Sequence, residues 1–235
     1  TYFGNRSEYD QASYISYMES HDEQWLMRRK KAFGNSTEGY STQSLETALN
    51  RQKLVGGFFF TVPGPKMMWQ FGELGYGWGE NECLKESDAC VASDPGRTAP
   101  KPIRWEYRDP ETSPDRVRLY NTWSALINLR QAHEVFRSPD TEVEMQVEDG
   151  ERIRWIRLSH PTMDALVVGN FGLLQRNATV TFPQTGTWYN VFANREINIQ
   201  NATKTLPLRP GEFRVYTSSE PAVTPEEGLV PSAIN

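Results

Sequence analysis

The hydrophobic and polar positions divide the chain into two parts with different periodicity. Residues 12–19 are apolar or aromatic on both faces, as in a strand of a parallel sheet covered by helices, and residues 66–71 form a second short apolar run. Residues 42–60 and the segment from Ser113 to His133 have apolar side chains at helical spacing. The first part therefore predicts a strand, a helix, a strand, a long loop and a helix, which is a repeated β/α unit.

Local signals place the ends of these two helices. Pro63-Gly64-Pro65 stops the first, whereas Ser113 can cap the second, with Pro114 and Asp115 suited to its first turn. The side chains expected to be buried are Leu45, Ala48, Leu49, Gln52, Val55 and Phe59 in the first helix, and Leu119, Tyr120, Trp123, Leu126 and Ile127 in the second. Residues 72–110 read as a long loop, and loops of this length are usually functional.

From residue 141 the pattern changes to short strands. The predicted strands are 142–148, 151–159, 164–170, 176–182, 187–192, 203–208 and 212–217. Asp149-Gly150 is a hairpin signal between the first two of them. Short strands at this spacing, with turn residues between them, indicate an antiparallel β-sandwich.

The expected fold class is therefore α/β plus all-β. We expect an α/β region at 1–138, a β-sandwich at 139–218 and a linker rich in Pro, Glu and Ser at 219–235. Two strands and two helices leave both edges of a parallel sheet open, so we also expect the natural protein to have more sequence before Thr1.

Composition and charge exclude some classes of partner. The chain has a net charge of -5, with 37% hydrophobic and 23% charged residues, which is ordinary for a globular protein. The one basic block, Arg28-Arg29-Lys30-Lys31, is too short to predict a nucleic-acid partner. No apolar run approaches the length of about 18 residues that a membrane span needs.

The two cysteines, Cys83 and Cys90, predict a small disulfide loop, because turn-forming and charged residues separate them. Such a staple is typical of secreted proteins, and two free thiols are the alternative. One cysteine pair and three scattered histidines do not suggest a zinc site, so no metal or cofactor is expected in this chain.

Charged side chains gather where the first predicted strand ends. The cluster Glu19-Ser20-His21-Asp22-Glu23 lies beside apolar residues, where charge is costly to hold. Gln70 and Glu73 follow the second strand in the same way. Functional residues of β/α folds lie at the carboxyl ends of the parallel strands, so these two polar ends can share a site.

Several chemistries could use this cluster. His21 with Asp22 and Glu23 could bind a metal, although no second histidine lies nearby in sequence. Ser20 is the immediate neighbour of His21, which disfavours a Ser-His-Asp hydrolase. Glycoside cleavage uses carboxylates beside the scissile bond, with histidine able to hold sugar hydroxyls. A charged loop that only solvates the strand end remains open.

Four segments resemble the alpha-amylase superfamily, glycoside hydrolase family thirteen. YMESHDE is similar to its fourth signature region, where an apolar strand ends in F-x-x-N-H-D, although Ser20 stands where many members have Asn. PGPKMMWQFGELG resembles the segment on the eighth barrel strand, G-x-P-x-I-x-x-G-x-E. LINLRQAHEVF resembles the eighth helix, and LRPGEFRVYTS the closing strand of the C-terminal domain. The resemblance covers nearly all of residues 14–218.

The resemblance implies the last two β/α units of a (β/α)8 TIM barrel followed by an antiparallel β-sandwich. It implies a retaining glycoside hydrolase acting on the alpha-1,4-glucosidic bonds of starch-like glucans. Asp22 would be the third essential carboxylate, which favours the oxocarbenium-like transition state. His21 would bind sugar hydroxyls, and Glu23 is a further substrate-binding candidate. Gln70 and Glu73 would order the loop after the eighth strand.

The resemblance also implies what this chain lacks. The nucleophile Asp and the acid/base Glu of the family lie on the fourth and fifth barrel strands, and its calcium site lies mostly upstream. We therefore expect a C-terminal fragment that is inactive alone, whose partners are an alpha-glucan and the missing N-terminal barrel portion. Calcium would then belong to the full-length enzyme.

The last residues bear on where the protein works. EEGLVPSAIN resembles the lead-in to bacterial secretion-sorting domains, which together with the cysteine pair predicts an extracellular or periplasmic location.

Two other functions stay open at this point. One is a transglycosylase or branching enzyme on the same barrel. The other is a non-catalytic glucan-binding protein using Trp188 and Tyr189, although alternation within the sandwich core explains these two aromatic residues better.

Overall fold

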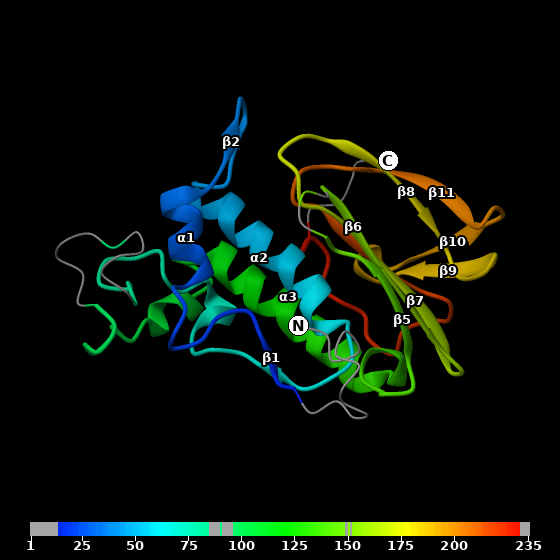
Figure 1. The fold of residues 1–235 in the computed structure, drawn as a ribbon, viewed down its shortest axis with the longest axis horizontal. Helices are drawn as coiled ribbons and strands as arrows, with labels where there is room; N and C mark the ends of the chain where they lie inside the picture. Colours follow the sequence, from blue (N-terminus) through cyan, green and yellow to red (C-terminus); the bar gives the residue numbers. More distant parts are fainter. Residues whose placement is uncertain (1–13, 85–89, 91–95, 149, 151, 231–235) are drawn as a thin grey trace.

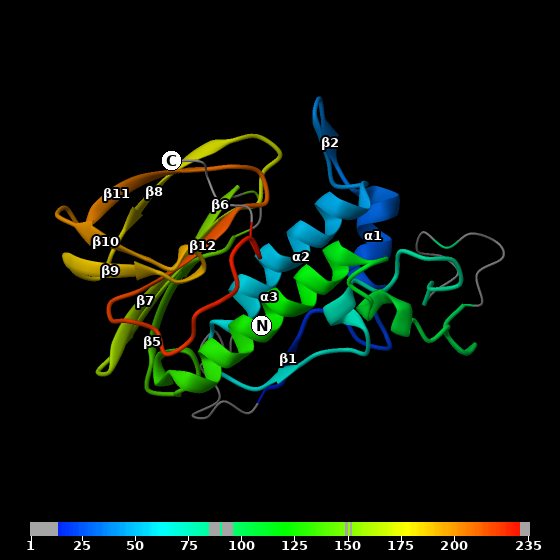
Figure 2. The same cartoon turned by 180° about the vertical axis from the view of Figure 1, so that it is seen from behind.

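Helices fill one half of the molecule and antiparallel sheets the other (Figure 1). The computed structural model describes residues 14–84, 90, 96–148, 150 and 152–230. The two longest helices lie side by side, and the first strand runs beside them, as the reverse view also shows (Figure 2). Among the helices of these described residues, none combines the length and apolar character that crossing a membrane requires.

The predicted strand-helix-strand order is confirmed. Strand β1 (Ser16–Tyr17) pairs in parallel with β4 (Lys66–Met67), and α2 (Leu45–Phe60) connects them. The hydroxyl of Ser44 caps α2 by accepting a hydrogen bond of 3.4 Å from the Thr47 amide. Both strands are shorter than their apolar runs, and the part of the first run before residue 14 lies outside the described residues.

Helix α3 (Pro114–Ala132) begins and ends where the sequence predicts. Ser113 occupies its N-cap position, but its side chain makes no capping hydrogen bond. The indole nitrogen of Trp123 donates to the carbonyl of Gln52 on α2 over 3.1 Å. A Cβ built on Gly56 would lie 2.3 Å from that nitrogen, so the close contact between α2 and α3 requires glycine there.

Some short elements were not expected from the sequence. Helix α1 (Leu26–Phe33) and the small hairpin of β2 (Ser36–Thr37) and β3 (Tyr40–Ser41) follow the charged cluster. The other short helices of the described residues are η2 (Gly72–Leu74), η3 (Trp105–Arg108), η4 (Glu134–Phe136) and η5 (Val191–Ala193). Of these, η2 and η3 lie in the predicted long loop and order parts of it.

The second half of the chain is antiparallel, as predicted. The described strands are β5 (Glu142–Gln146), β6 (Ile153–His160), β7 (Met163–Asn170), β8 (Arg176–Thr181), β9 (Gly186–Asn190), β10 (Arg195–Ile199), β11 (Thr203–Leu208) and β12 (Phe213–Thr217). They form a six-stranded sheet in the order β10-β9-β12-β7-β6-β5 and a two-stranded sheet of β11 and β8. Strand β10 was missed by the sequence prediction, and the Asp149-Gly150 turn lies partly outside the described residues.

Strand β7 separates two hydrophobic clusters because its side chains alternate between the faces of the sheet. Leu166 and Val168 pack with buried residues of β8 and β11, which makes the two sheets a sandwich. Ala165 and Val167 face the other way and join the cluster that contains Trp123. The helices are therefore packed on the outer face of the larger sheet.

The described part of the predicted linker lies against the helices. Leu229 is buried, and its carbonyl accepts hydrogen bonds from Lys53 Nζ at 2.8 Å and Thr122 Oγ1 at 3.3 Å. Burial lowers the pKa of Lys53 to about 8. The domain boundaries after residues 138 and 218 stay a prediction.

Candidate functional site

The charged cluster forms an exposed loop between buried ends, just after β1. Glu19 and Ser20 are buried at its start, and Gln24 and Trp25 are buried at its end. The three residues between them, His21, Asp22 and Glu23, are exposed. The loop therefore presents polar side chains from a fixed base, beside the residues that follow β4.

Asp22 and His21 form a pair within this loop. The carboxylate of Asp22 makes an ion pair with Arg97, and its second oxygen lies 3.3 Å from His21 Nε2. The Asp22 amide donates to Ser20 Oγ over 3.1 Å, which holds the turn. The Asp22 side chain is still 51% exposed. A ligand can therefore contact the Asp22 carboxylate without any rearrangement of buried side chains.

A cavity of about 360 Å³ lies beside this pair. His21 and Arg97 line it together with Trp69, Phe71 and Tyr76. The rings of His21 and Trp69 are 5.8 Å apart. A cavity with aromatic walls and a few converging polar groups suits a ligand that has both hydroxyl groups and apolar ring faces.

Glu23 is placed differently from the other two predicted site residues. Its carboxylate accepts hydrogen bonds from the hydroxyls of Ser20 and Tyr17, the latter at 3.5 Å. It is absent from the lining of the cavity, whereas His21 lines it directly and Asp22 borders it through His21 and Arg97. That Glu23 contacts substrate stays a prediction.

Glu19 anchors the start of the loop to the first residue of α1. Its carboxylate accepts a 2.9 Å hydrogen bond from the Leu26 amide, at the start of α1. Burial raises the pKa of Glu19 to about 7, although its bond to the Leu26 amide and the charge of Lys30 act in the other direction. A Cβ on Gly72 would come within 2.5 Å of Glu19 Oε1, so the loop after β4 packs directly on this carboxyl group.

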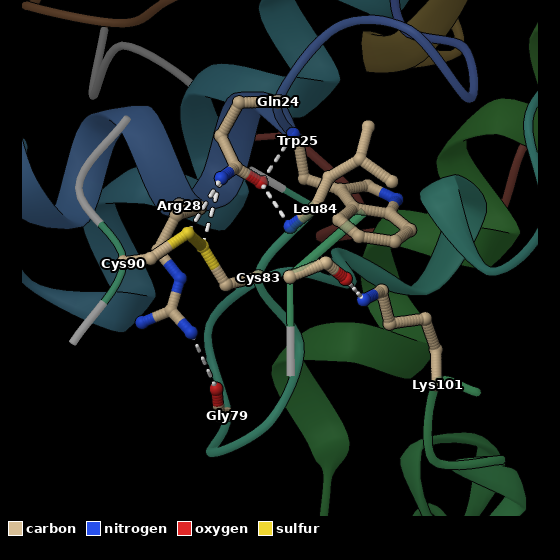
Figure 3. Close-up of a disulfide and its surroundings, with 9 residues drawn as sticks. Gln24, Trp25, Arg28, Gly79, Cys83, Leu84, Cys90 and Lys101 are labelled. Atoms are coloured by element: carbon tan, nitrogen blue, oxygen red, sulfur yellow. Dashed lines mark hydrogen bonds between the residues drawn. A yellow bond between two sulfur atoms is a disulfide. The ribbon is translucent and has the colours of Figure 1, made fainter. Parts of the chain in front are cut away.

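Gln24 connects the loop of residues 19–25, called the Asp22 loop from here on, to a disulfide (Figure 3). Cys83 and Cys90 are joined, with their Cα atoms 5.6 Å apart. The Gln24 amide nitrogen donates to Cys83 Sγ at 3.0 Å and Cys90 Sγ at 3.4 Å. Its oxygen accepts from the amides of Trp25 and Leu84 at 3.1 and 3.0 Å. One buried side chain therefore ties the Asp22 loop to a wall of the cavity.

The segment after β4 contributes one of its two predicted polar residues to the cavity. Gln70 lines the cavity, whereas Glu73 lies in η2, where burial raises its pKa. Arg116 on α3 donates to the carbonyls of Leu74 and Gly75, both at 2.6 Å, and so holds η2 against the helix.

Glu82, which sequence reasoning did not single out, organises the long loop. It is fully buried, and its Oε2 accepts from the amides of Gly77 at 2.8 Å and Gly79 at 2.9 Å. Its Oε1 accepts from Arg104 Nε at 2.9 Å and the Tyr107 hydroxyl at 2.6 Å. The carboxylate has four donors, so its burial is compensated.

Metal-ligating side chains do not cluster in the part of the chain that the structure describes. In this part of the chain, no three His, Cys, Asp or Glu side chains come close enough together to share an ion.

Comparison with known proteins gives a match in fold. No family model matches the chain, and no curated protein matches it in sequence. It is similar to the solved alpha-amylase from Geobacillus thermoleovorans complexed with acarbose, with a TM-score of 0.60 and 14% identity over 91% of this chain and 41% of that one. For a cyclomaltodextrinase the TM-score is 0.59, with 18% identity over 87% of this chain and 29% of that one.

A third structure, AmyP in complex with maltose, matches with a TM-score of 0.59 and 16% identity over 77% of this chain and 36% of that one. The chain therefore spans less than half the length of each of these proteins. At these identities the likeness shows the fold. The predicted resemblance to alpha-amylase-type enzymes is confirmed at that level.

Proposed function

We propose that this chain is the C-terminal part of a retaining glycoside hydrolase that cleaves alpha-1,4-glucosidic bonds in starch-like glucans. In this proposal, β1 with α2 and β4 with α3 are the last two units of a (β/α)8 barrel. The observation that carries it is the Asp22–His21 pair beside an aromatic cavity, at the carboxyl ends of two parallel strands. The similarity of the fold to an alpha-amylase and a cyclomaltodextrinase supports it.

Asp22 would stabilise the positive charge of the transition state. It would not be the nucleophile that attacks the sugar. Cleavage of a glycosidic bond passes through an oxocarbenium-like transition state, in which positive charge develops on the sugar ring. A carboxylate already held in place by Arg97, His21 and its own turn stabilises that charge without reorganising. His21 would hold a hydroxyl group of the same sugar.

The remaining chemistry would come from elsewhere in the natural protein. The nucleophile and the acid/base would be carboxylates on other barrel strands, so this chain alone would be inactive. The proposed substrate is an alpha-glucan, and solved structures of similar fold are described as complexes with maltose and acarbose. The Cys83–Cys90 disulfide supports an extracellular or periplasmic location.

The anomeric form of the first product tests this function. The full-length natural protein would be mixed with soluble starch and followed by proton NMR. We expect shorter glucans that first appear as the alpha-anomer, which is the outcome of retention. Beta-anomers first would contradict the proposed mechanism. Products longer or more branched than the substrate would favour a transferase, and binding without cleavage a non-catalytic protein.

A further inference from the structure

Two large apolar side chains face solvent next to the cavity. Trp105 is 71% exposed and Ile103 is 68% exposed. Ile103 also lines the cavity beside Asp22. Keeping such side chains in water forgoes the stabilisation of burying them, and apolar surface at the rim of a cavity is typical of a binding site.

The chain on either side of these residues is fixed. The Tyr76 hydroxyl donates to the Pro102 carbonyl over 2.6 Å. Arg104, which lies between the two exposed residues, donates to buried Glu82 at 2.9 Å, and the Tyr107 hydroxyl donates to the same carboxylate at 2.6 Å. Arg104 and Tyr107 therefore point toward buried Glu82, whereas Ile103 and Trp105 point outward, from a backbone that is held at several points.

Phe71 joins the exposed tryptophan to the cavity. The ring of Trp105 meets that of Phe71 edge-on at 5.1 Å, and Phe71 stacks on buried Tyr76 at 5.7 Å. Phe71 lines the cavity and has a φ of 58°, in the left-handed region. That conformation costs a residue with a side chain about 1 to 2 kcal/mol. Strain of this kind concentrates at functional sites.

We infer that Trp105, Ile103 and Phe71 form an additional sugar-binding platform, which extends the Asp22 cavity and holds further glucose units of the bound chain. This inference rests on the proposed function. It is favoured by continuity, because Phe71 and Ile103 line both the platform and the cavity. It is also favoured by chemistry, since an indole ring matches the apolar face of a pyranose ring and leaves the sugar hydroxyls in water.

The platform makes cleavage depend on chain length. The experiment measures kcat/KM of the full-length protein and its Trp105→Ala variant on maltotriose and on maltoheptaose. We expect Trp105→Ala to lower kcat/KM for maltoheptaose by about tenfold, as for one aromatic contact at a binding hot spot, and for maltotriose by less than about twofold. Trp105→Phe should restore most of the loss.

The matched control is Leu174→Ala, which removes another exposed apolar side chain, 58% exposed, from the sandwich half. It should leave both substrates unaffected. An equal loss on both substrates, or no loss, would overturn the platform. A large drop in melting temperature for Trp105→Ala would show instead that Trp105 packs against another part of the protein. If the parent cleaves neither substrate, the proposed function itself fails.

Discussion

Replacing Glu82 by Gln tests the account of the long loop most sharply. The change keeps the size of the side chain and removes its charge. Each carboxylate oxygen of Glu82 accepts two hydrogen bonds, one from the Gly77 and Gly79 amides, the other from Arg104 and Tyr107. On one side the new amide NH₂ group meets the Gly77 and Gly79 N–H donors. On the other side it meets the Arg104 N–H donor and the Tyr107 hydroxyl, and only the hydroxyl can rotate to accept from it.

The expected loss follows from these contacts. At least one hydrogen bond disappears, worth about 0.5 to 1.5 kcal/mol, or about 1.5 to 3 when the acceptor is charged. Arg104 also loses its buried counter-charge. The free energy of unfolding should therefore fall by about 2 to 4 kcal/mol.

Urea unfolding measures this loss, and hydrogen exchange locates it. The Gly77 and Gly79 amides should exchange faster in the variant, because both have lost or weakened their acceptor. Glu106→Gln is the matched control: Glu106 also pairs with Arg104, at 3.4 Å, but its side chain is 55% exposed. An exposed pair of this kind contributes about 0 to 1 kcal/mol.

Two outcomes would contradict this role of Glu82. If Glu82→Gln costs no more than Glu106→Gln, the buried network does not hold the loop. If stability falls but the Gly77 and Gly79 amides keep their protection, the loss arises somewhere else.

Two further predictions concern the base of the Asp22 loop. Burial raises the pKa of Glu19 from 4.5 to about 7, so its contribution to stability is lost as the pH rises through that range. In urea unfolding, the free energy of unfolding of Glu19→Gln relative to that of the parent should therefore rise by about 2 kcal/mol between pH 5 and pH 7. If the difference between variant and parent stays constant over this range, the pKa of Glu19 is not raised. Gln24→Met keeps the volume but removes the acceptor of the Trp25 and Leu84 amides. It should lower the free energy of unfolding by about 2 to 3 kcal/mol. A loss below about 0.5 kcal/mol would show that Gln24 does not hold the Asp22 loop to the cavity wall.

The sequence predicted most elements because their patterns are local. Helices α2 and α3 carry helical periodicity with clear stop and start signals, and the longer strands alternate. Helix α1 was missed because four consecutive basic residues hide its periodicity, although Met27 and Arg28 are buried. Strand β10 was missed because only Ile197 and Ile199 are apolar in it.

The site was predictable only where it is contiguous. His21 and Asp22 were found because they follow an apolar run and resemble a known motif. Arg97 lies 75 positions from Asp22 in sequence, and Cys83 lies 59 positions from Gln24. Such contacts depend on how the long loop folds back, for which neither periodicity nor spacing provides a signal.

Starch hydrolysis by the full-length protein, with and without Asp22→Asn, shows whether Asp22 stabilises the transition state of glycosidic cleavage. The exchange keeps the shape and removes the charge, and Asp140→Asn changes an exposed aspartate outside the site as the control. The account predicts that Asp22→Asn lowers kcat by about 10²- to 10³-fold while folding and maltoheptaose binding persist, and that Asp140→Asn behaves like the parent. Full activity of Asp22→Asn would contradict the account, and the cluster from Glu19 to Glu23 would then be a solvated strand end.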